Sequence, residues 1–499
     1  NGSSSNDYKH PVAPDAFRGF MGGDVNGITA KIQEGYFNKL GVDAIWMTPL
    51  VENIISHVDE GTGVSYGFHG YWTKDWTAFD KRIGTKKEIA QMVKVAHDHG
   101  IRVIFDVVIN HTGPVTPLDV QWPEEWVRTD PGCTYQDYGS TVTCTLVKNL
   151  PDIKTESTAE VKLPDFLIKK WKTEGRYEEE MTELDAFFAR TNYPRRPYYY
   201  IIKWLTDLIR DFGIDGFRVD TAKHTEEEIW KVLRDEAVLA REDWKKTHST
   251  EVMDDSKFYM VGEVYNYYAG NGRIYDFGDK KVDYFNYGFD ALINFDFKGD
   301  AQKSYQSLFS KYDALLRGPL KGKSVLNYIS SHDDGNPFDK SRAKPFESAT
   351  KLLLTQGAAQ IYYGDESARS LKVKAKGDAT LRSFMNWEEQ KSGENAKILE
   401  HWQKLGQFRR NHLSVGAGKH FLISEKPLVF GRIYEDKLIR DMIVCALEMN
   451  TGIKKIPVQT FFYEGEVVVD FYSGTTGKVL NGMVEINSPF DLVLLQKTE

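Results

Sequence analysis

Residues 88–111 read Glu-Ile-Ala-Gln-Met-Val-Lys-Val-Ala-His-Asp-His-Gly-Ile-Arg-Val-Ile-Phe-Asp-Val-Val-Ile-Asn-His, and this stretch decides the fold class. Its first half carries apolar residues at helical spacing, at Ile89, Met92, Val93 and Ala96. Gly100 then ends the helix, and the apolar run 102–108 is typical of a strand buried on both faces. A helix followed at once by a buried strand predicts an α/β domain with a parallel sheet.

The same unit recurs along the chain. A second helical stripe covers 199–212, ends at Gly213 and is followed by the strand-like run 216–220. The other apolar runs of strand length are 43–48, 258–263, 291–295, 325–329 and 360–363. Repeated β-then-α units predict a parallel sheet with helices on both faces, or a closed barrel.

Two stretches depart from this alternation. Residues 112–196 are polar and rich in Thr, Glu and Pro, which predicts a long insertion between a strand and its next helix. Residues 411–499 contain short strand-like runs separated by Gly, Asn and Ser, which predicts a C-terminal all-β sandwich. Cys445 lies in one of these apolar runs, so we expect a buried residue without a partner.

Composition excludes some classes of function. The 499 residues are 41% hydrophobic and 27% charged, as in ordinary globular chains, and the net charge of −8 argues against a nucleic-acid partner. No apolar run approaches the ~20 residues of a membrane span. The first residues do not resemble a secretory leader, although a leader can be removed from a secreted protein.

Cys133 and Cys144 are placed symmetrically about Tyr138-Gly139. A two-residue turn there predicts a hairpin with the two cysteines opposed, at a distance that suits a disulfide. A disulfide would indicate an oxidising compartment. Two buried free thiols remain the alternative.

Polar residues end several of the expected strands. Asn110-His111 follows one strand, Asp220 and Glu263 each end another, and Ser331-His332-Asp333-Asp334 follows a fourth. Barrel enzymes place their chemistry at the carboxyl ends of strands, and paired carboxylates suit hydrolysis of a glycosidic bond. At any one of these positions, the alternative is a carboxylate in a solvated loop. For all of these polar residues together, the alternative is a metal cluster, although no His or Cys spacing typical of a zinc site supports it.

Arg218 and Asp220 share one face of their strand, because side chains alternate along a strand. The guanidinium is therefore expected to keep Asp220 ionised as a nucleophile. Glu263 should instead hold a proton, because burial and nearby carboxylates raise the pKa of a carboxyl group. We expect Arg218 to pair with Asp220 rather than with Glu263.

At these residues the sequence resembles the α-amylase family, glycoside hydrolase family 13. The similar motifs appear in family order from residue 1 to about 410. They are Gly22-Gly-Asp-Val-Asn-Gly-Ile28, His69-Gly-Tyr-Trp72, Asp106-Val-Val-Ile-Asn-His111, Leu150-Pro-Asp-Ile153, Gly216-Phe-Arg-Val-Asp-Thr-Ala-Lys-His224, Val261-Gly-Glu263, Ser331-His-Asp333 and Ile361-Tyr-Tyr-Gly-Asp-Glu366.

The resemblance implies roles for these residues. Asp220 would be the nucleophile, Glu263 the general acid/base and Asp333 the stabiliser of the transition state. Tyr71 would stack under the sugar at the cleaved bond. The same subsite would be lined by His111, Arg218 and His332, and the leaving-group side by Lys223 and His224.

The resemblance also implies a structural Ca²⁺ between barrel and insertion. The matching ligands are the side chains of Asn110 and Asp152 and the backbone carbonyl of His224. All are oxygen donors, as Ca²⁺ requires, but Ca²⁺ takes 6–8 ligands. A plain hydrogen bond between Asn110 and Asp152 is the alternative.

Some positions depart from the family pattern. Ser331 stands where Asn is usual, and Ala359 where Pro is common. Asp334 is an extra carboxylate, and a register error of one residue in the motif would exchange it with Asp333. The family places its first strand before a loop similar to the first residues of this chain. We therefore expect seven barrel strands, with the first of the family's eight absent.

Together these features predict a (β/α)₈ barrel of residues 1–111 and 197–410, an inserted domain of residues 112–196 and a C-terminal β-sandwich of residues 411–499. The expected activity is endo-acting hydrolysis of α-1,4-glucosidic bonds in an α-glucan polysaccharide or maltooligosaccharide, with retention at the anomeric carbon. A cyclomaltodextrinase or transglycosylase, and a non-catalytic glucan-binding or interaction protein, are the alternatives. We expect a monomer that is secreted, periplasmic or on the cell surface.

Overall fold

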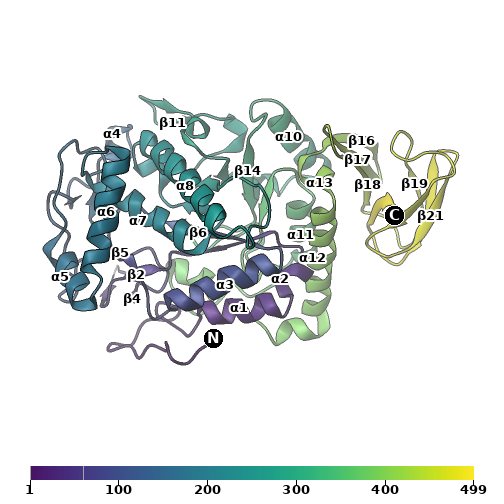
Figure 1. Ribbon diagram of the computed structural model, residues 1–499. Coiled ribbons are helices and arrows are strands. Elements are labelled where there is room, and N and C mark those ends of the chain that lie inside the picture. The colour runs from purple at the N-terminus through teal and green to yellow at the C-terminus, as the bar shows by residue number, and fades with distance from the viewer. Residues whose placement is uncertain (1, 60, 499) are drawn as a thin grey trace.

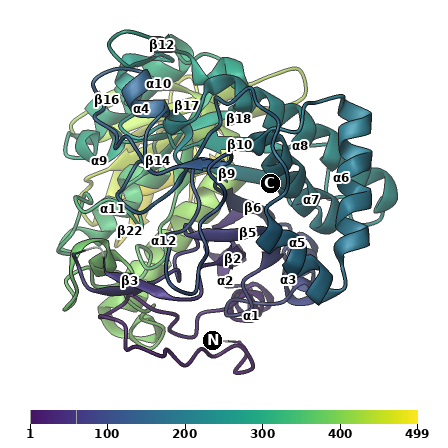
Figure 2. The same ribbon diagram turned by 90° about the vertical axis from the view of Figure 1, so that its left-hand side faces the viewer.

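The computed structural model describes residues 2–59 and 61–498, and its centre is a parallel sheet of seven strands. The sheet curls with its helices outside, as expected for the barrel class (Figures 1 and 2). Its strands, in spatial order, are β1 (Ala44–Met47), β6 (Arg102–Val107), β9 (Gly216–Val219), β10 (Tyr259–Gly262), β13 (Ala291–Asn294), β14 (Ser324–Tyr328) and β15 (Ala358–Gln360).

The helices around the sheet form for local reasons that the sequence shows. In α3 (Lys86–Asp98), Thr85 and Glu88 form a reciprocal capping box, and the predicted apolar stripe is buried. In α7 (Pro197–Phe212), Gly213 ends the helix with a positive φ. The other main helices of this layer are α1 (Val25–Gln33), α2 (Tyr36–Lys39), α8 (Glu227–Thr247), α9 (Phe297–Asp300), α10 (Tyr305–Arg317), α11 (Pro345–Leu353), α12 (Gly393–Asn411) and α13 (Leu413–Ala417).

The edges of the sheet are β1 and β15. Within the described part of the chain, no strand precedes β1, so seven strands are seen, as predicted. The last strand was predicted at 360–363, and this range is wrong, because β15 is Ala358–Gln360. The chain leaves the sheet there, since the hydroxyl groups of Tyr362 and Tyr363 bond to the carbonyl oxygens of Leu381 and Ser383.

Residues between β6 and α7 form the predicted insertion, which lies at the far end of the molecule from the C-terminus (Figure 1). Its elements are β7 (Val127–Arg128), α4 (Gly139–Val142), β8 (Asp152–Ile153), α5 (Asp165–Glu174) and α6 (Tyr177–Thr191). Short antiparallel pairs border it and the barrel: β2 (Val51–Asn53) with β5 (Thr73–Phe79), β3 (His57–Asp59) with β4 (Val64–Tyr66), and β11 (Tyr275–Asp276) with β12 (Lys281–Val282).

A disulfide joins Cys133 to Cys144, as predicted, with the two Cα atoms 4.9 Å apart. The predicted hairpin between them is wrong, because the chain forms the single-turn helix α4 there. The Ser140 hydroxyl accepts hydrogen bonds from the backbone N–H groups of Gln136 and Asp137, and these bonds favour a helical turn over a strand pair.

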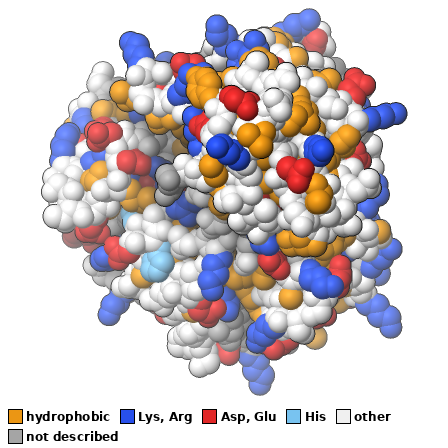
Figure 3. Space-filling view, turned by 90° about the vertical axis from the view of Figure 1, so that its right-hand side faces the viewer, with side chains coloured by type: hydrophobic (Ala, Val, Ile, Leu, Met, Phe, Trp, Pro, Cys, Tyr) orange, Lys and Arg blue, Asp and Glu red, His pale blue; other side chains and the backbone are white. Residues whose placement is uncertain are grey.

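The C-terminal strands form one antiparallel sheet of eight strands. Its two halves fold over a shared apolar core that includes Val429, Ile456 and Val484, so one continuous sheet builds the expected sandwich. Cys445 is a free, buried cysteine, as predicted. On the face in Figure 3, apolar side chains are interspersed with charged ones. The strands are β16 (Lys419–Glu425), β17 (Leu428–Glu435), β18 (Arg440–Leu447), β19 (Gly452–Pro457), β20 (Val467–Asp470), β21 (Thr476–Leu480), β22 (Met483–Ser488) and β23 (Val493–Lys497).

Among the helices that the structure describes, none has both the length and the apolar character needed to cross a bilayer.

Candidate active site

Two carboxylates stand directly after the last residues of two neighbouring strands. Val219 of β9 lies opposite Gly262 of β10 in a parallel pair, so the next residues, Asp220 and Glu263, emerge side by side. Both continue the backbone ladder, because Asp220 N–H bonds to the Val107 carbonyl and Glu263 N–H bonds to the Val219 carbonyl. The carboxyl ends of the strands therefore bring together the two residues predicted as nucleophile and acid.

Arg218 is buried at the centre of this group, with its side chain 1% exposed. Its Nη1 atom lies 2.6 Å from Asp220 Oδ1, as the strand alternation predicted. The same guanidinium also lies 2.8 Å from Glu263 Oε1 through Nη2. The expectation that Arg218 would pair with Asp220 and not with Glu263 is therefore wrong, because β10 lies beside β9 and places Glu263 against the same side chain.

Burial raises the pKa values of both carboxyl groups above those of exposed acids. Burial raises the pKa of Glu263 to about 8; the Arg218 charge opposes this shift, and the charges of Asp220 and Asp333 add to it. Burial also raises the pKa of Asp220, to about 6, against the opposing charge of Arg218. Glu263 thus holds a proton in a pH range where Asp220 is ionised, which is the division of roles that acid and nucleophile require.

Asp106 is a buried carboxylate of this site to which the sequence analysis assigned no role. It lies opposite Arg218 in the β6–β9 register and accepts hydrogen bonds from Arg218, from the Tyr71 hydroxyl (2.7 Å) and from Trp46 Nε1 (3.1 Å). Burial raises its pKa to about 6, with Arg218 opposing. The sequence signal that could have identified Asp106 was its position at the start of the motif 106–111.

The structure distinguishes Asp333 from Asp334. The Asp333 side chain is 54% exposed and lies 3.8 Å from Arg382 Nη2, whereas Asp334 is held by Lys298 and by the Tyr328 hydroxyl. Asp333 is also the one whose charge acts on both Asp220 and Glu263. Asp333 is therefore the less tightly held of the two side chains, and its role as the stabilising carboxylate stays a prediction.

Tyr71, His111 and His332 line one side of the group. The Tyr71 hydroxyl lies 3.0 Å from His332 Nε2, and the two rings are stacked nearly parallel. His111 Nε2 lies 3.1 Å from the Tyr71 carbonyl oxygen. Burial lowers the pKa of His111 to about 4 and that of His332 well below its usual value, so both imidazoles are neutral at pH 7 and suited to hydrogen-bond sugar hydroxyls.

Lys223 and His224 follow Asp220 on the short helix η1 (Ala222–His224). Lys223 Nζ donates to the Tyr275 hydroxyl at 3.2 Å and lies within 6 Å of the rings of Tyr135 and Tyr265. Burial lowers the pKa of Lys223 to about 8. Tyr135 lies in the insertion, and Tyr265 and Tyr275 lie in the segment that follows β10. The strand patterns of the sequence did not identify these neighbours.

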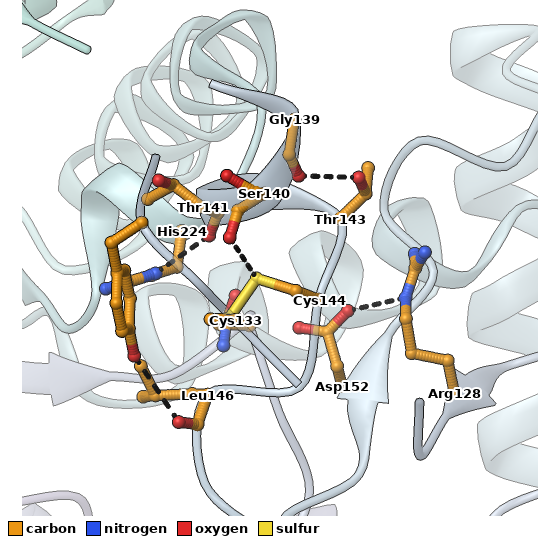
Figure 4. The surroundings of a disulfide bond; sticks show 12 residues. Arg128, Cys133, Gly139, Ser140, Thr141, Thr143, Cys144, Leu146, Asp152 and His224 are labelled. Atoms are coloured by element: carbon orange, nitrogen blue, oxygen red, sulfur yellow. Dashed lines mark hydrogen bonds and ion pairs between the residues drawn. A yellow bond between two sulfur atoms is a disulfide. The ribbon is translucent and has the colours of Figure 1, made fainter. Parts of the chain in front are cut away.

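His224 connects the barrel to the insertion. Its Nδ1 atom bonds to the Thr141 carbonyl oxygen at 2.9 Å, close to the disulfide (Figure 4). The predicted metal ligands Asn110 and Asp152 are also brought together, because the Ile153 N–H bonds to the Asn110 carbonyl and residues 111 and 152 form a β-bridge. Three distant segments therefore meet at this junction.

Asp152 has one paired and one unpaired oxygen. Oδ2 accepts a hydrogen bond from Arg128 Nε at 2.8 Å (Figure 4), while Oδ1 is buried with no hydrogen-bond partner among the described residues. Burial raises the pKa of Asp152 to about 8, with Arg128 opposing. Within 2–59 and 61–498, no three His, Cys, Asp or Glu side chains gather as a metal cluster. The orphaned oxygen and the Asn110 amide nevertheless fit a cation that prefers oxygen ligands.

A cavity of about 290 Å³ opens beside the carboxylates. Its lining combines acids with aromatic rings and includes Glu263, Tyr265, Phe295, His332 and Asp333. Cavities with mixed aromatic and polar linings suit the two faces of a sugar, one apolar and one rich in hydroxyl groups.

Comparison with known proteins gives a consistent result. The family model described as the α-amylase catalytic domain matches residues 2–407. A periplasmic α-amylase of Escherichia coli (strain K12) is 35% identical over 480 residues, covering 84% of this chain and 66% of that protein. A cyclomaltodextrin glucanotransferase of Geobacillus stearothermophilus is 25% identical over 451 residues, covering 87% of this chain and 55% of that protein. The chain thus spans less than two thirds of these relatives' length.

Solved structures share the fold at low identity. An Anoxybacillus α-amylase superposes with a TM-score of 0.70 at 20% identity, covering 100% of this chain and 96% of that one. A three-domain cyclomaltodextrin glucanotransferase, CldA, superposes with a TM-score of 0.68, also at 20% identity, covering 100% of this chain and 97% of that one. The arrangement of barrel, insertion and C-terminal sheet is therefore shared with a protein named as an α-amylase and with one named as a cyclomaltodextrin glucanotransferase.

Proposed function

The chain belongs to the α-amylase family, and from this premise we propose that it is an endo-acting glycoside hydrolase. Its substrates would be α-1,4-glucosidic bonds in starch-like glucans and maltooligosaccharides, and the product would retain the anomeric configuration of the substrate. The observation that carries this proposal is the shared guanidinium of Arg218, which contacts both Asp220 and Glu263. Retaining enzymes need their two carboxyl groups only ~5–5.5 Å apart, and one shared partner favours such closeness.

In the first step Asp220 attacks the anomeric carbon. The bond from that carbon to the glycosidic oxygen breaks, and Glu263 gives its proton to the departing oxygen, so a glycosyl ester forms on Asp220 and Glu263 becomes a carboxylate. The raised pKa of Glu263, about 8, keeps that proton available near neutral pH. Arg218 keeps Asp220 ionised and oriented through the 2.6 Å contact.

In the second step Glu263 acts as a base. It takes a proton from water, the hydroxide oxygen attacks the anomeric carbon, and the ester bond to Asp220 breaks. Both carboxyl groups return to their starting protonation states. Asp333, with no ion pair shorter than 3.8 Å among the described residues, would stabilise the positive charge that develops on the sugar ring.

The other site residues would bind glucose units. Tyr71 offers its ring to the sugar at the cleaved bond, with neutral His111 and His332 beside it. Lys223 and His224 would face the leaving group, where Tyr265 and Tyr275 add aromatic surface.

A Ca²⁺ ion held by Asn110, Asp152 and the His224 carbonyl would stabilise the junction of barrel and insertion by its charge. Arg128, which also pairs with Glu156, holds the Oδ2 atom of Asp152. The proposal is supported by the unpaired Asp152 Oδ1 atom.

A transglycosylating or cyclodextrin-acting relative is the second candidate. The similarity to cyclomaltodextrin glucanotransferases supports it, since those proteins match over most of this chain. Product analysis on starch and on cyclodextrins separates the two: linear oligosaccharides of mixed length indicate endo-hydrolysis, and cyclic products or preferred opening of cyclodextrins indicate the second candidate.

Two observations support the proposal that the protein acts outside the cytoplasm. The Cys133–Cys144 disulfide suits an oxidising compartment, and the Escherichia coli relative is described as periplasmic.

The direct test uses Asp220→Asn and the stereochemistry of the product. The variant should lose turnover of starch by a factor of about 10⁴ or more while binding maltooligosaccharides, because an amide cannot form the ester. Proton NMR of the first products of the unaltered enzyme should show the α-anomer. A variant that still hydrolyses starch at a near-normal rate, or an initial β-anomer, would contradict the proposal.

A further inference from the structure

Phe384 is an exposed aromatic side chain outside the group described above, and the half-buried Phe17 lies against it. Phe384 is 63% exposed, and its ring meets that of Phe17 edge-on with centroids 5.6 Å apart. The two residues come from distant parts of the chain, one before α1 and one after the 3₁₀ helix η4 (Gly377–Leu381). A single exposed apolar side chain is common on folded surfaces, so the case for a binding site rests on what surrounds Phe384.

The backbone directs Phe384 outward. Residues 382–386 have no helical or strand hydrogen bonding, and Ser383 points into the protein, where its hydroxyl accepts a bond from Arg369 (2.7 Å) and donates to the Ser370 carbonyl. Phe384 beside it is exposed, whereas the Arg382 side chain is only 12% exposed and turns inward, toward the His332 carbonyl and Asp378.

Arg382 joins this segment to the carboxylates. Its Nε atom donates to the His332 carbonyl, and its Nη2 atom lies 2.8 Å from Asp378 and 3.8 Å from Asp333. Arg18 contacts the same Asp378 at 2.9 Å. The residue before Arg18 is Phe17, so a continuous polar strip leads from Asp333 to the aromatic pair.

Phe17 is held in a conformation that a bulky residue rarely adopts. Its φ is +58°, in the left-handed region. Arg18 beside it is buried and anchored by its bonds to Lys376 and Asp378, and its carbonyl accepts the Tyr66 N–H. The surrounding structure thus maintains a strained backbone that places the half-buried Phe17 ring against Phe384, and such strain concentrates at binding sites.

We propose that the exposed ring of Phe384, supported edge-on by Phe17, is a stacking platform for a glucose unit of the substrate, on the glycon side and several units from the cleaved bond. This inference rests on the proposed function and extends its site. The leaving-group side is occupied by Lys223 and its tyrosine neighbours, whereas the strip of Arg382, Asp378 and Arg18 begins at Asp333. Sugars stack their apolar faces on aromatic rings, and Asp378, whose side chain is 34% exposed, supplies a partner for the hydroxyl groups in between.

The test compares a long and a short substrate, because only the long one reaches the platform. In Phe384→Ala, kcat/KM for maltoheptaose should fall about fivefold more than kcat/KM for maltotriose, as one lost stacking contact predicts. Phe384→Tyr keeps the ring and should restore most of the difference. Tyr463→Ala removes a ring that is 70% exposed at the C-terminal sheet, and should leave the ratio unchanged.

A second measurement is independent of turnover. Calorimetry with Asp220→Asn and with the double variant Asp220→Asn/Phe384→Ala should show weaker maltoheptaose binding in the double variant and a smaller change for maltotriose. If the enzyme hydrolyses both oligosaccharides and Phe384→Ala alters neither the kcat/KM ratio nor the binding, the platform is refuted and the proposed function stands. If the unaltered protein neither binds nor cleaves any α-glucan, the proposed function is refuted together with this inference.

Discussion

Nη2 of Arg218 lies 2.8 Å from Oε1 of Glu263, so the guanidinium that orients the proposed nucleophile also contacts the proposed acid. A positive charge at this distance favours the ionised form of Glu263, yet burial outweighs it and raises the pKa to about 8. The other oxygen of Glu263 accepts the Thr221 N–H at 2.9 Å. The acid is thus fixed at both oxygens before substrate binds, as a preorganised site requires.

Glu263→Gln should discriminate between substrates by their leaving groups. An amide has no acidic proton, so hydrolysis of starch should fall by about 10²–10⁴-fold, the usual contribution of general acid catalysis. An α-glucoside with an activated aryl leaving group needs little protonation, and its glycosylation step should lose much less. Single-turnover kinetics on both substrates measure the difference; equal losses would show that Glu263 is not the acid.

Activity should follow a bell-shaped pH profile. Asp220 must be ionised, so activity should fall as the pH drops through its pKa of about 6, and Glu263 must be protonated, so activity should fall as the pH rises through its pKa of about 8. Both limbs report the coupled group rather than single residues. The profile of kcat/KM on maltooligosaccharides measures both limbs. In Glu263→Gln assayed with the activated substrate, the alkaline limb should disappear, and its persistence would assign it to another group.

Asp333 and Asp334 should respond differently to the same change. Asp333→Asn removes the charge that faces Asp220 and Glu263, and kcat should fall by about 10²-fold or more. Asp334→Asn weakens the contacts with Lys298 and Tyr328 and leaves the charge of Asp333 in place, so kcat should change by less than about tenfold. Steady-state kinetics of the two variants, with melting curves as a control for folding, make the comparison. The reverse ranking would mean that Asp334 is the stabilising carboxylate.

Chelation should reveal whether a cation ties the insertion to the barrel. A ligand that binds only the folded protein stabilises it by mass action, so EGTA should lower the melting temperature by a few degrees and added Ca²⁺ should restore it. Asp152→Asn should abolish this response. If the unaltered protein does not respond to EGTA, no cation contributes, and the bonds of Ile153 to Asn110 and of His224 to Thr141 hold the junction.

Much of the fold was predictable because its signals are local. Buried strands of a parallel sheet are continuous apolar runs, and amphipathic helices repeat every three to four residues, so β6 and α3 were found with nearly correct bounds. The end of β15 was not found, because the apolar run 361–363 continues past the strand. There the tyrosine hydroxyls reach carbonyls about 20 residues away, and a local pattern does not contain that information.

The sequence by itself determined which residues stand at the carboxyl ends of the strands, because those positions follow directly from where apolar runs stop. It also placed Arg218 on the face of Asp220, because strand alternation acts between residues two positions apart. Only the tertiary structure decided that Arg218 contacts Glu263, that Asp106 belongs to the same cluster, and that Arg382 reaches Asp333. Those contacts join residues 45 to 112 positions apart, and they depend on which strands are neighbours and on their register. Register is set by the packing of the whole barrel, so no local stretch of the chain specifies it.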